Sequence, residues 1–307
     1  MSSTTSLKIL YKKTIPYIWG YQYFCSLLKF VFTKFLSSNW HTRLPVKPGQ
    51  LIKANLSFGT VILTKPERCS IAKKLYWTNG EIEPVEDRNA LEYFIELSRN
   101  SDFVLDIGSN SGIFSLASAS ANPRAKVFAF DILPEAFHIL IDNLIINDLT
   151  SIVTPYLIGV GKTSKFKAPF KNITSEMPTS LKLDENYDDG LSVNIEIKTL
   201  DNIFKDNNII GQACIKIDVE GFEGDIFKNS DNVLEVHRPY FLCEVLPSSL
   251  DYNDYDKLFI KNKYNKFLIT DSGLIQYEEI KPNRRFKDWL FIPIEKSEIV
   301  RFFLSDK

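Results

Sequence analysis

The sequence predicts an α/β fold with a doubly wound, mostly parallel sheet, preceded by an extension that forms a helix and a β-hairpin. From about residue 80 onward, short apolar segments alternate with longer segments of helical periodicity. Such alternation is typical of βαβ units whose helices cover both faces of a parallel sheet. The 307 residues, 44% hydrophobic and 24% charged, suffice for one large domain and an appendage. A soluble globular protein is therefore expected, and a disordered or fibrous one is excluded.

Charge separates the extension from the rest of the chain. Residues 1–66 contain nine Lys and Arg and no Asp or Glu, whereas acidic side chains exceed basic ones by ten in the remainder. We therefore expect residues 1–66 to form a basic extension and residues 67–307 to form the main domain. Charge asymmetry of this kind suggests a partner surface.

Within the extension, residues 27–36 have the periodicity of an amphipathic helix. The longest uncharged run, residues 14–28, is interrupted by Pro16 and Gly20 and is shorter than the roughly 18–20 residues of a transmembrane span. We therefore expect a cytoplasmic protein, with peripheral contact to the inner face of the membrane through residues 8–36 as one use of this helix. Packing of the helix on its own domain is the commoner use, and both interpretations stay open.

The remaining elements follow in order. Residues 51–65 indicate a hairpin with a bend near Gly59, and the segment 159–190 has no sustained period and is expected to be an irregular loop. Helices are expected around residues 91–95, from 110 to 122 and from Pro134. Strands are expected at 103–107, 126–131, 152–157, 193–198, 213–219, 240–245, 267–270 and 289–292.

The first motif that carries chemistry lies where a strand turns into a helix, the position at which open α/β sheets bind ligands. It consists of Asp106, Gly108, Asn110 and Gly112, and Asp131 follows the next strand. A pyrophosphate site needs the spacing GxGxxG and no carboxylate beside the phosphate, so this loop favours a cationic ligand without phosphate. S-adenosylmethionine has those properties, and Asp131 is placed to accept both hydroxyls of its ribose. Each aspartate also has an ordinary use in a cap or a turn.

The second motif runs from Lys216 through Asp218 and Glu220 to Glu223, and Glu244 ends the next strand. Alternate residues of a strand share a face, so Lys216 and Asp218 point the same way, and a lysine in a central strand needs a partner. We expect Asp106, Asp218 and Glu244 to meet at neighbouring strand ends, where carboxylates act as a general base or bind a divalent ion. Glu220 and Glu223 also suit a helix N-terminus without any catalytic role.

Other kinds of site have little support. The four cysteines are widely spaced without a CxxC pair, and the three histidines lack ligand spacing, so no metal site is assigned. The acidic main domain argues against a nucleic-acid partner.

These motifs together resemble the FkbM family of methyltransferases, from about residue 71 to residue 293. Further matching elements are Glu83 with Pro84, Asn143 with Asn147, Thr199 to Asp201, Ser180 with Leu181, and Arg238 with Pro239. Ser109 stands where the family usually has alanine, and Asp131 precedes Ile-Leu-Pro where the family has Glu-Pro. The extension has no counterpart in the family pattern.

The resemblance implies a Rossmann-like class I methyltransferase that uses S-adenosylmethionine for O-methylation, with a carbohydrate or a glycosylated small molecule as acceptor. The expected cofactor-binding residues are Asp106, Gly108, Asn110, Gly112 and Asp131. For proton removal we favour Asp218, followed by Glu244 or Glu220, with Lys216 as the neutralising cation. A divalent ion shared by Asp218 and Glu244 is a less favoured alternative.

Two other functions are compatible with parts of these patterns. One is a catalytically silent methyltransferase-fold protein that docks to a membrane or a partner through its N-terminal segment; the joint presence of Lys216, Asp218 and Glu223 counts against it. The other is a nicotinamide-dependent dehydrogenase, which the missing second glycine disfavours.

Overall fold

The structure is a computed structural model that describes residues 14–35, 44–162, 164–169, 192–247 and 252–304. The described residues group into two compact units, one up to Glu83 and one from Pro84 onward. The expected pair Ser180 and Leu181, and most of the loop expected at 159–190, lie outside the described residues.

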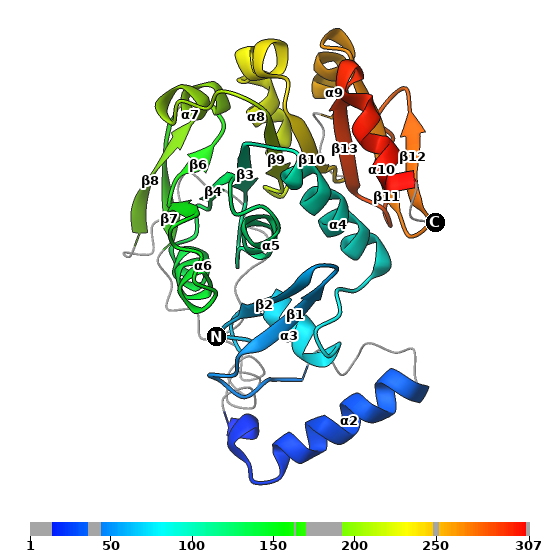
Figure 1. Cartoon of the computed structure of the whole chain (residues 1–307). Coiled ribbons are helices and arrows are strands. Elements are labelled where there is room, and N and C mark those ends of the chain that lie inside the picture. Colours follow the sequence, from blue (N-terminus) through cyan, green and yellow to red (C-terminus); the bar gives the residue numbers. More distant parts are fainter. Residues whose placement is uncertain (1–13, 36–43, 163, 170–191, 248–251, 305–307) are drawn as a thin grey trace. The chain divides into compact units, whose positions relative to one another are not determined.

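The N-terminal unit combines short helices with one hairpin (Figure 1). The hairpin pairs β1 with β2 in an antiparallel register, from Ile52 opposite Leu63 to Leu56 opposite Gly59, as the sequence predicts. The elements of this unit are η1 (Ile15–Tyr17), α2 (Tyr21–Phe35), β1 (Ile52–Leu56), β2 (Gly59–Leu63) and α3 (Ser70–Trp77).

The boundary between the units differs from the expected one, because α3 belongs with the hairpin. Ala72, Leu75 and Trp77 of α3 are buried, and the turn after α3 is bonded to β1 through Asn55 N and the Gly80 carbonyl at 2.8 Å. Charge alone places the boundary after residue 66, whereas these contacts extend the N-terminal unit by one helix.

Helix α2 docks within the N-terminal unit by one stripe. Tyr21 and Cys25 are buried in a small apolar cluster with Val46 and Trp77, and the Tyr21 hydroxyl donates a 2.8 Å hydrogen bond to the Pro45 carbonyl. The amphipathic helix of the sequence analysis is therefore present, and it begins earlier than predicted. In the described part of the chain, no helix is long and apolar enough to cross a bilayer.

The second unit contains an eight-stranded sheet in the order β12-β11-β13-β10-β9-β3-β4-β5. The five strands from β10 to β5 are parallel, and β13, β11 and β12 join by antiparallel pairings. This confirms the doubly wound, mostly parallel α/β fold. The strands of this sheet are β3 (Phe103–Ile107), β4 (Lys126–Phe130), β5 (Val153–Tyr156), β9 (Ala213–Ile217), β10 (Tyr240–Glu244), β11 (Tyr264–Thr270), β12 (Gly273–Tyr277) and β13 (Asp288–Pro293).

Helices cover both faces of this sheet: α4, α5 and α6 lie below the strands in the view of Figure 1, and α7, α8 and α9 lie above them. Alternate residues of a strand point to opposite faces of the sheet. Leu105 and Ile107 therefore pack in the core beneath α7, α8 and α9, whereas Asp106 points to the opposite face and contacts α5. The helices and turns are α4 (Val85–Arg99), α5 (Ile113–Ala121), α6 (Pro134–Ile146), α7 (Leu200–Asp206), α8 (Glu223–Lys228), η3 (Val233–His237), α9 (Tyr252–Lys261), η4 (Ile294–Ile299) and α10 (Val300–Leu304).

A separate three-stranded sheet corrects the expectation of an irregular loop from residue 159. Strands β6 (Gly159–Val160) and β7 (Ser164–Pro169) both pair with β8 (Ser192–Lys198). Polar residues and Pro169 made β7 hard to recognise in the sequence, and β6 has only 2 residues, whereas β8 corresponds to the strand expected at 193–198. The sequence also missed β12, which pairs antiparallel with β11 at one edge of the large sheet. At the other edge lies β5, which contains Pro155.

Candidate functional site

The expected site residues gather where β3 and β9 end. The chain runs from β3 outward through β4 to β5 and then returns to β9 on the other side of β3. Ligands of open α/β sheets bind at such a reversal of strand order, beyond the carboxyl ends of the strands. Asp106 of β3 is in register with Lys216 of β9, so the two predicted motifs are adjacent.

The loop after β3 is built around close backbone contact. Gly108 has φ +77°, and a Cβ added there would lie 1.8 Å from the Asp218 carbonyl oxygen. Gly112 has φ +82° and begins α5 without a side chain that could cap the helix. Both glycines are therefore required by geometry: Gly108 lets β3 approach the end of β9, and Gly112 turns the chain into α5.

Asp106 supplies the cap that Gly112 lacks. Its Oδ2 accepts hydrogen bonds from Ser115 N at 3.0 Å and Ser115 Oγ at 2.6 Å, while Oδ1 lies 4.0 Å from Lys216 Nζ. The side chain is fully buried, and burial raises the pKa of Asp106 although Lys216 and Ser115 oppose the shift. Asp106 thus occupies a free amide at the N-terminus of α5, the kind of group that would otherwise bind phosphate.

Asp131 ties the same loop to α6. Its two carboxylate oxygens accept hydrogen bonds from Asn110 N and Leu133 N, each at 2.8 Å. Burial raises the pKa of Asp131 to about 6, against the opposing effect of these amides. Asn143, which is fully buried, donates from Nδ2 to the Ser111 carbonyl at 2.8 Å. The loop is therefore held from β4 and α6 together.

Lys216 connects the two motifs. Its Nζ lies 3.1 Å from Asp218 Oδ2 and 4.8 Å from the centre of the Phe114 ring. Burial lowers the pKa of this ammonium, but Asp218 and Asp106 outweigh that effect, so the pKa lies above its ordinary value. Lys216 consequently remains a cation and serves to neutralise carboxylates.

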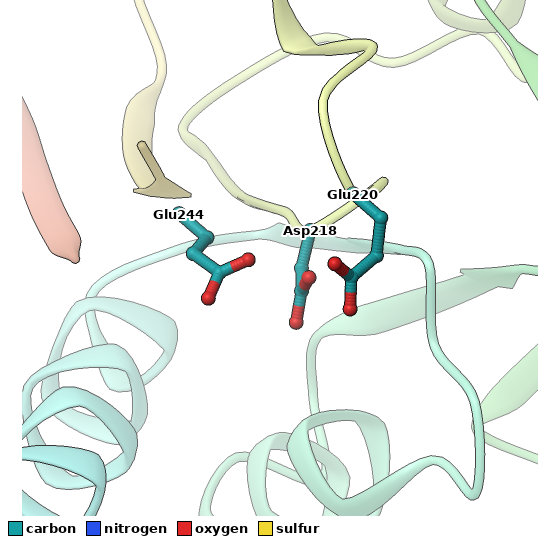
Figure 2. A group of neighbouring side chains, drawn as sticks. All are labelled: Asp218, Glu220 and Glu244. Atoms are coloured by element: carbon teal, nitrogen blue, oxygen red, sulfur yellow. The ribbon is translucent and has the colours of Figure 1, made fainter. Parts of the chain in front are cut away.

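Figure 2 shows the three carboxylates of Asp218, Glu220 and Glu244 gathered at one place, and Lys216 contacts this group through Asp218. Carboxylate oxygens of Asp218, Glu220 and Glu244 lie within 4.8 Å of one another. Glu220 reaches this position with φ +56°, the left-handed conformation that follows the end of β9. The structure therefore brings together Asp218 and Glu244, as expected, and adds Glu220 to them. Asp106 lies near this group only through Lys216.

The carboxylates of this cluster are hard to ionise together. Burial, followed by the charges of Asp218 and Asp288, raises the pKa of Glu244 to about 8. Burial and Asp218 also raise the pKa of Glu220. Carboxylates that share a site raise one another's pKa, and a base whose pKa lies near neutrality is suited to proton transfer.

Two residues of this site were missed by sequence reasoning. Asp288 lies opposite Glu244 in the pairing of β10 with β13, and burial together with Asp218 raises its pKa to about 7. Lys287 Nζ lies 3.4 Å from Glu244 Oε1. Asp288 begins the antiparallel strand β13 and Lys287 directly precedes it, more than 40 positions after Glu244, so no local motif predicts them.

Other motif residues hold the framework. Glu223 is buried and its Oε1 accepts from Gly221 N at 3.0 Å and from Val219 N at 3.3 Å, which closes the turn after β9. Thr199 caps α7, and the Asp201 carboxylate accepts from the first amides of η3. Glu223, Thr199 and Asp201 therefore match the family pattern because they stabilise the local backbone structure.

The loop and the cluster suit S-adenosylmethionine. Asp106 Oδ1, Ser109 Oγ, Asn110 Oδ1 and Ser111 Oγ are buried without a hydrogen-bond partner among the described residues. A ligand that brings ammonium and hydroxyl donors would satisfy such acceptors. The surplus of carboxylates over Lys216 and Lys287 favours a cation, and the occupied α5 terminus disfavours phosphate.

Comparison with known proteins gives the same family. Residues 106–266 match the methyltransferase FkbM domain. The chain is 26% identical over 159 residues to methyltransferase sdnD of Sordaria araneosa, covering 43% of this chain and 61% of that relative. It is 24% identical over 179 residues to the hexuronic acid methyltransferase AglP of Haloferax volcanii, covering 58% of this chain and 69% of AglP.

Among solved structures, the methyltransferase FkbM of Methylobacillus flagellatus KT is similar, with a TM-score of 0.43 and 15% identity over 68% of this chain and 55% of that one. The chain thus spans less than two thirds of the length of sdnD and of this crystallised relative. The matched domain nevertheless covers more than half of the 307 residues and contains both motifs. The chain belongs to the methyltransferase FkbM domain family.

Proposed function

We propose that this protein transfers a methyl group from S-adenosylmethionine to a sugar hydroxyl of a glycan, a glycolipid or a glycosylated metabolite. The observation that carries the proposal is the cluster of Asp218, Glu220 and Glu244 beside the Asp106 loop. When bound, the cofactor supplies an electrophilic methyl group. The name of AglP supports a sugar acid as one kind of acceptor.

The chain's own residues position the reactants and accept the proton. The unpartnered oxygens of the loop bind and orient the donor, and orientation of this kind contributes on the order of 7–11 kcal/mol to lowering the barrier. An alcohol is a weak acid, so a base must remove its proton as the methyl group moves. The carboxylate cluster provides that base at the carboxyl ends of β9 and β10.

The contacts favour Glu244 over Asp218 as the base, which reverses the order preferred from sequence. Asp218 is paired with the Lys216 ammonium at 3.1 Å, so its carboxylate is already engaged in neutralising that buried cation. Glu244 lies 3.4 Å from Lys287, and burial with its acidic neighbours raises its pKa to about 8. Asp218 then keeps Lys216 and the strand ends in place. A silent binding protein has no need for a base of this kind.

The test compares Glu244→Gln with Asp218→Asn and with Asp206→Asn, an exposed control on α7. Formation of S-adenosylhomocysteine is measured with hexuronic acids, neutral hexoses and non-sugar alcohols, and donor binding is measured separately by calorimetry. We expect Glu244→Gln to lower kcat by about 10²- to 10⁴-fold with donor affinity retained. The acid limb of the wild-type pH profile should lie above the ordinary carboxyl range and vanish in this variant.

Three results would contradict parts of this proposal. Full turnover in Glu244→Gln would remove Glu244 as the base. Methylation confined to non-sugar alcohols would exclude the sugar acceptor. Thermal stabilisation by NAD and none by S-adenosylhomocysteine would exclude S-adenosylmethionine as the cofactor. The shift is measurable because a ligand at 100 times its Kd stabilises the folded protein by roughly 2.7 kcal/mol.

A further inference from the structure

Helix α2 has two apolar stripes, of which one packs into the small apolar cluster of the N-terminal unit and the other is more than half exposed. Tyr21, Cys25 and Leu28, spaced i, i+4 and i+7, form the docked stripe. Tyr23, Leu27 and Phe30 repeat the same spacing on the opposite side of the helix, and they are 81%, 61% and 55% exposed. Residues with this spacing share one helix face. The structure thus leaves a continuous apolar face on α2, which we call the outer face.

The turn before α2 is also apolar and exposed. Trp19 is 95% exposed, and Tyr17 and Ile18 precede it with most of their surface accessible. Five of the seven large apolar side chains exposed between residues 17 and 30 are aromatic. Apolar patches on this scale mark interaction sites, and Trp and Tyr are enriched where proteins meet the headgroup region of a bilayer.

Charge identifies the partner. Residues 1–66 contain nine Lys and Arg and no acidic side chain, so the outer face belongs to a strongly positive segment. A second copy of the chain would bring two such segments together and oppose like charges. An anionic lipid surface attracts basic segments and receives an aromatic, apolar helix face at the headgroup boundary.

We infer that the outer face of α2, together with the exposed turn that precedes the helix, docks on the surface of an anionic membrane. The helix lies in the plane of the interface and does not cross the bilayer, since no described helix is long and apolar enough to do so. Its docked stripe keeps it attached to the N-terminal unit through Cys25 and through Lys29, whose Nζ lies 3.4 Å from the centre of the Tyr76 ring. This inference goes beyond methyl transfer and does not depend on it.

The experiment measures co-flotation of the full chain with two kinds of liposome, phosphatidylcholine alone and phosphatidylcholine with 30% phosphatidylglycerol. We expect binding to the anionic vesicles at 0.1 M NaCl that weakens at 0.5 M, because salt screens the attraction between charges. The triple variant Tyr23→Ser, Leu27→Ser, Phe30→Ser should lose at least tenfold in partition coefficient. Because these side chains are exposed, its melting curve should match that of the wild type.

The matched control replaces three exposed apolar residues of the second unit, as Ile210→Ser, Val236→Ser and Ile260→Ser, and should retain binding. Trp19 reports the contact directly: vesicles should shift the tryptophan emission to the blue, and Trp19→Phe should remove that shift. Equal binding by the triple variant and the wild type overturns the inference, as does failure of the wild type to bind anionic vesicles. A wild-type dimer that becomes a monomer in the triple variant also overturns it and assigns the outer face to a second copy.

Discussion

The carboxylates at the carboxyl edge of the large sheet fall into two groups that differ in what they contact. Asp106, Asp131 and Glu223 each accept hydrogen bonds from backbone amides. In the described part of the chain, Asp218 and Glu244 contact lysine ammonium groups and the acidic residues around them. Both groups lie within the same motifs.

This difference distinguishes carboxylates that hold the backbone in place from carboxylates that are available for proton transfer. The carboxylates that accept hydrogen bonds from backbone amides hold the loop between β3 and α5 and the turn after β9 in place. Their removal should therefore lower the free energy of unfolding. Carboxylates that face one another repel each other when ionised, so their removal should change activity and pH dependence while costing little stability.

The largest effect on stability is expected where the loop touches β9. Gly108→Ala would place a Cβ 1.8 Å from the Asp218 carbonyl oxygen at φ +77°, so overpacking and backbone strain add together. We expect the free energy of unfolding to fall by roughly 3 kcal/mol in urea denaturation. Gly112→Ala is the control, because its new Cβ meets only the movable Leu140 side chain and should cost less. Equal losses would show that the contact with β9 is not tight.

A smaller effect is expected at the amide that holds the loop from α6. Asn143→Ala removes the 2.8 Å hydrogen bond to the Ser111 carbonyl and leaves a buried space. The expected loss is about 2 kcal/mol, equal at every pH because no ionisable group changes. Asn147→Ala, at the partly exposed end of the same helix, should lose less than 1 kcal/mol. A loss that varies with pH would link Asn143 to the carboxylate cluster and weaken the comparison.

The smallest effect is the pH dependence of the cluster itself. The pKa values of Glu244 and Asp288 are raised to about 8 and about 7, so the folded protein binds protons that the unfolded chain releases near pH 4. The stability they contribute is therefore present at low pH and lost as pH rises toward 8. We expect the free energy of unfolding without ligand to fall between pH 6 and pH 8, and Glu244→Gln to remove roughly 1 kcal/mol of that fall.

Glu295→Gln is the control of opposite sign for this pH series. The hydrogen bond from Arg238 lowers the pKa of Glu295, so the stability from Glu295 is lost on acidification through the ordinary carboxyl range. The slope between pH 6 and pH 8 should be unchanged in this variant. A wild-type stability that stays flat or rises over the same interval would contradict the assignment of Glu244 and Asp288.

The sequence was informative where chemistry and local structure coincide. The loop from Asp106 to Gly112 follows a buried strand and precedes a helix, and parallel pairing then places it beside Lys216. The meeting of Asp218 with Glu244 also follows from strand ends that share one edge. Strand alternation and glycine positions are local properties, so they can be recognised from the sequence alone.

What the sequence did not reveal depends on pairing between distant segments. Asp288 and Lys287 reach the site because β13 inserts antiparallel between β10 and β11. The docked stripe of α2 is likewise set by Trp77, which follows more than 40 positions after α2.

Pro155 lies in β5, an outer strand of the large sheet that has one neighbour among the described strands. A proline has no amide hydrogen, so this edge lacks one of the donors that an incoming strand would need. Exposed sheet edges are where folded proteins join into aggregates, and edge prolines discourage such growth. Pro155 therefore works against the pairing of another chain with this edge of the sheet.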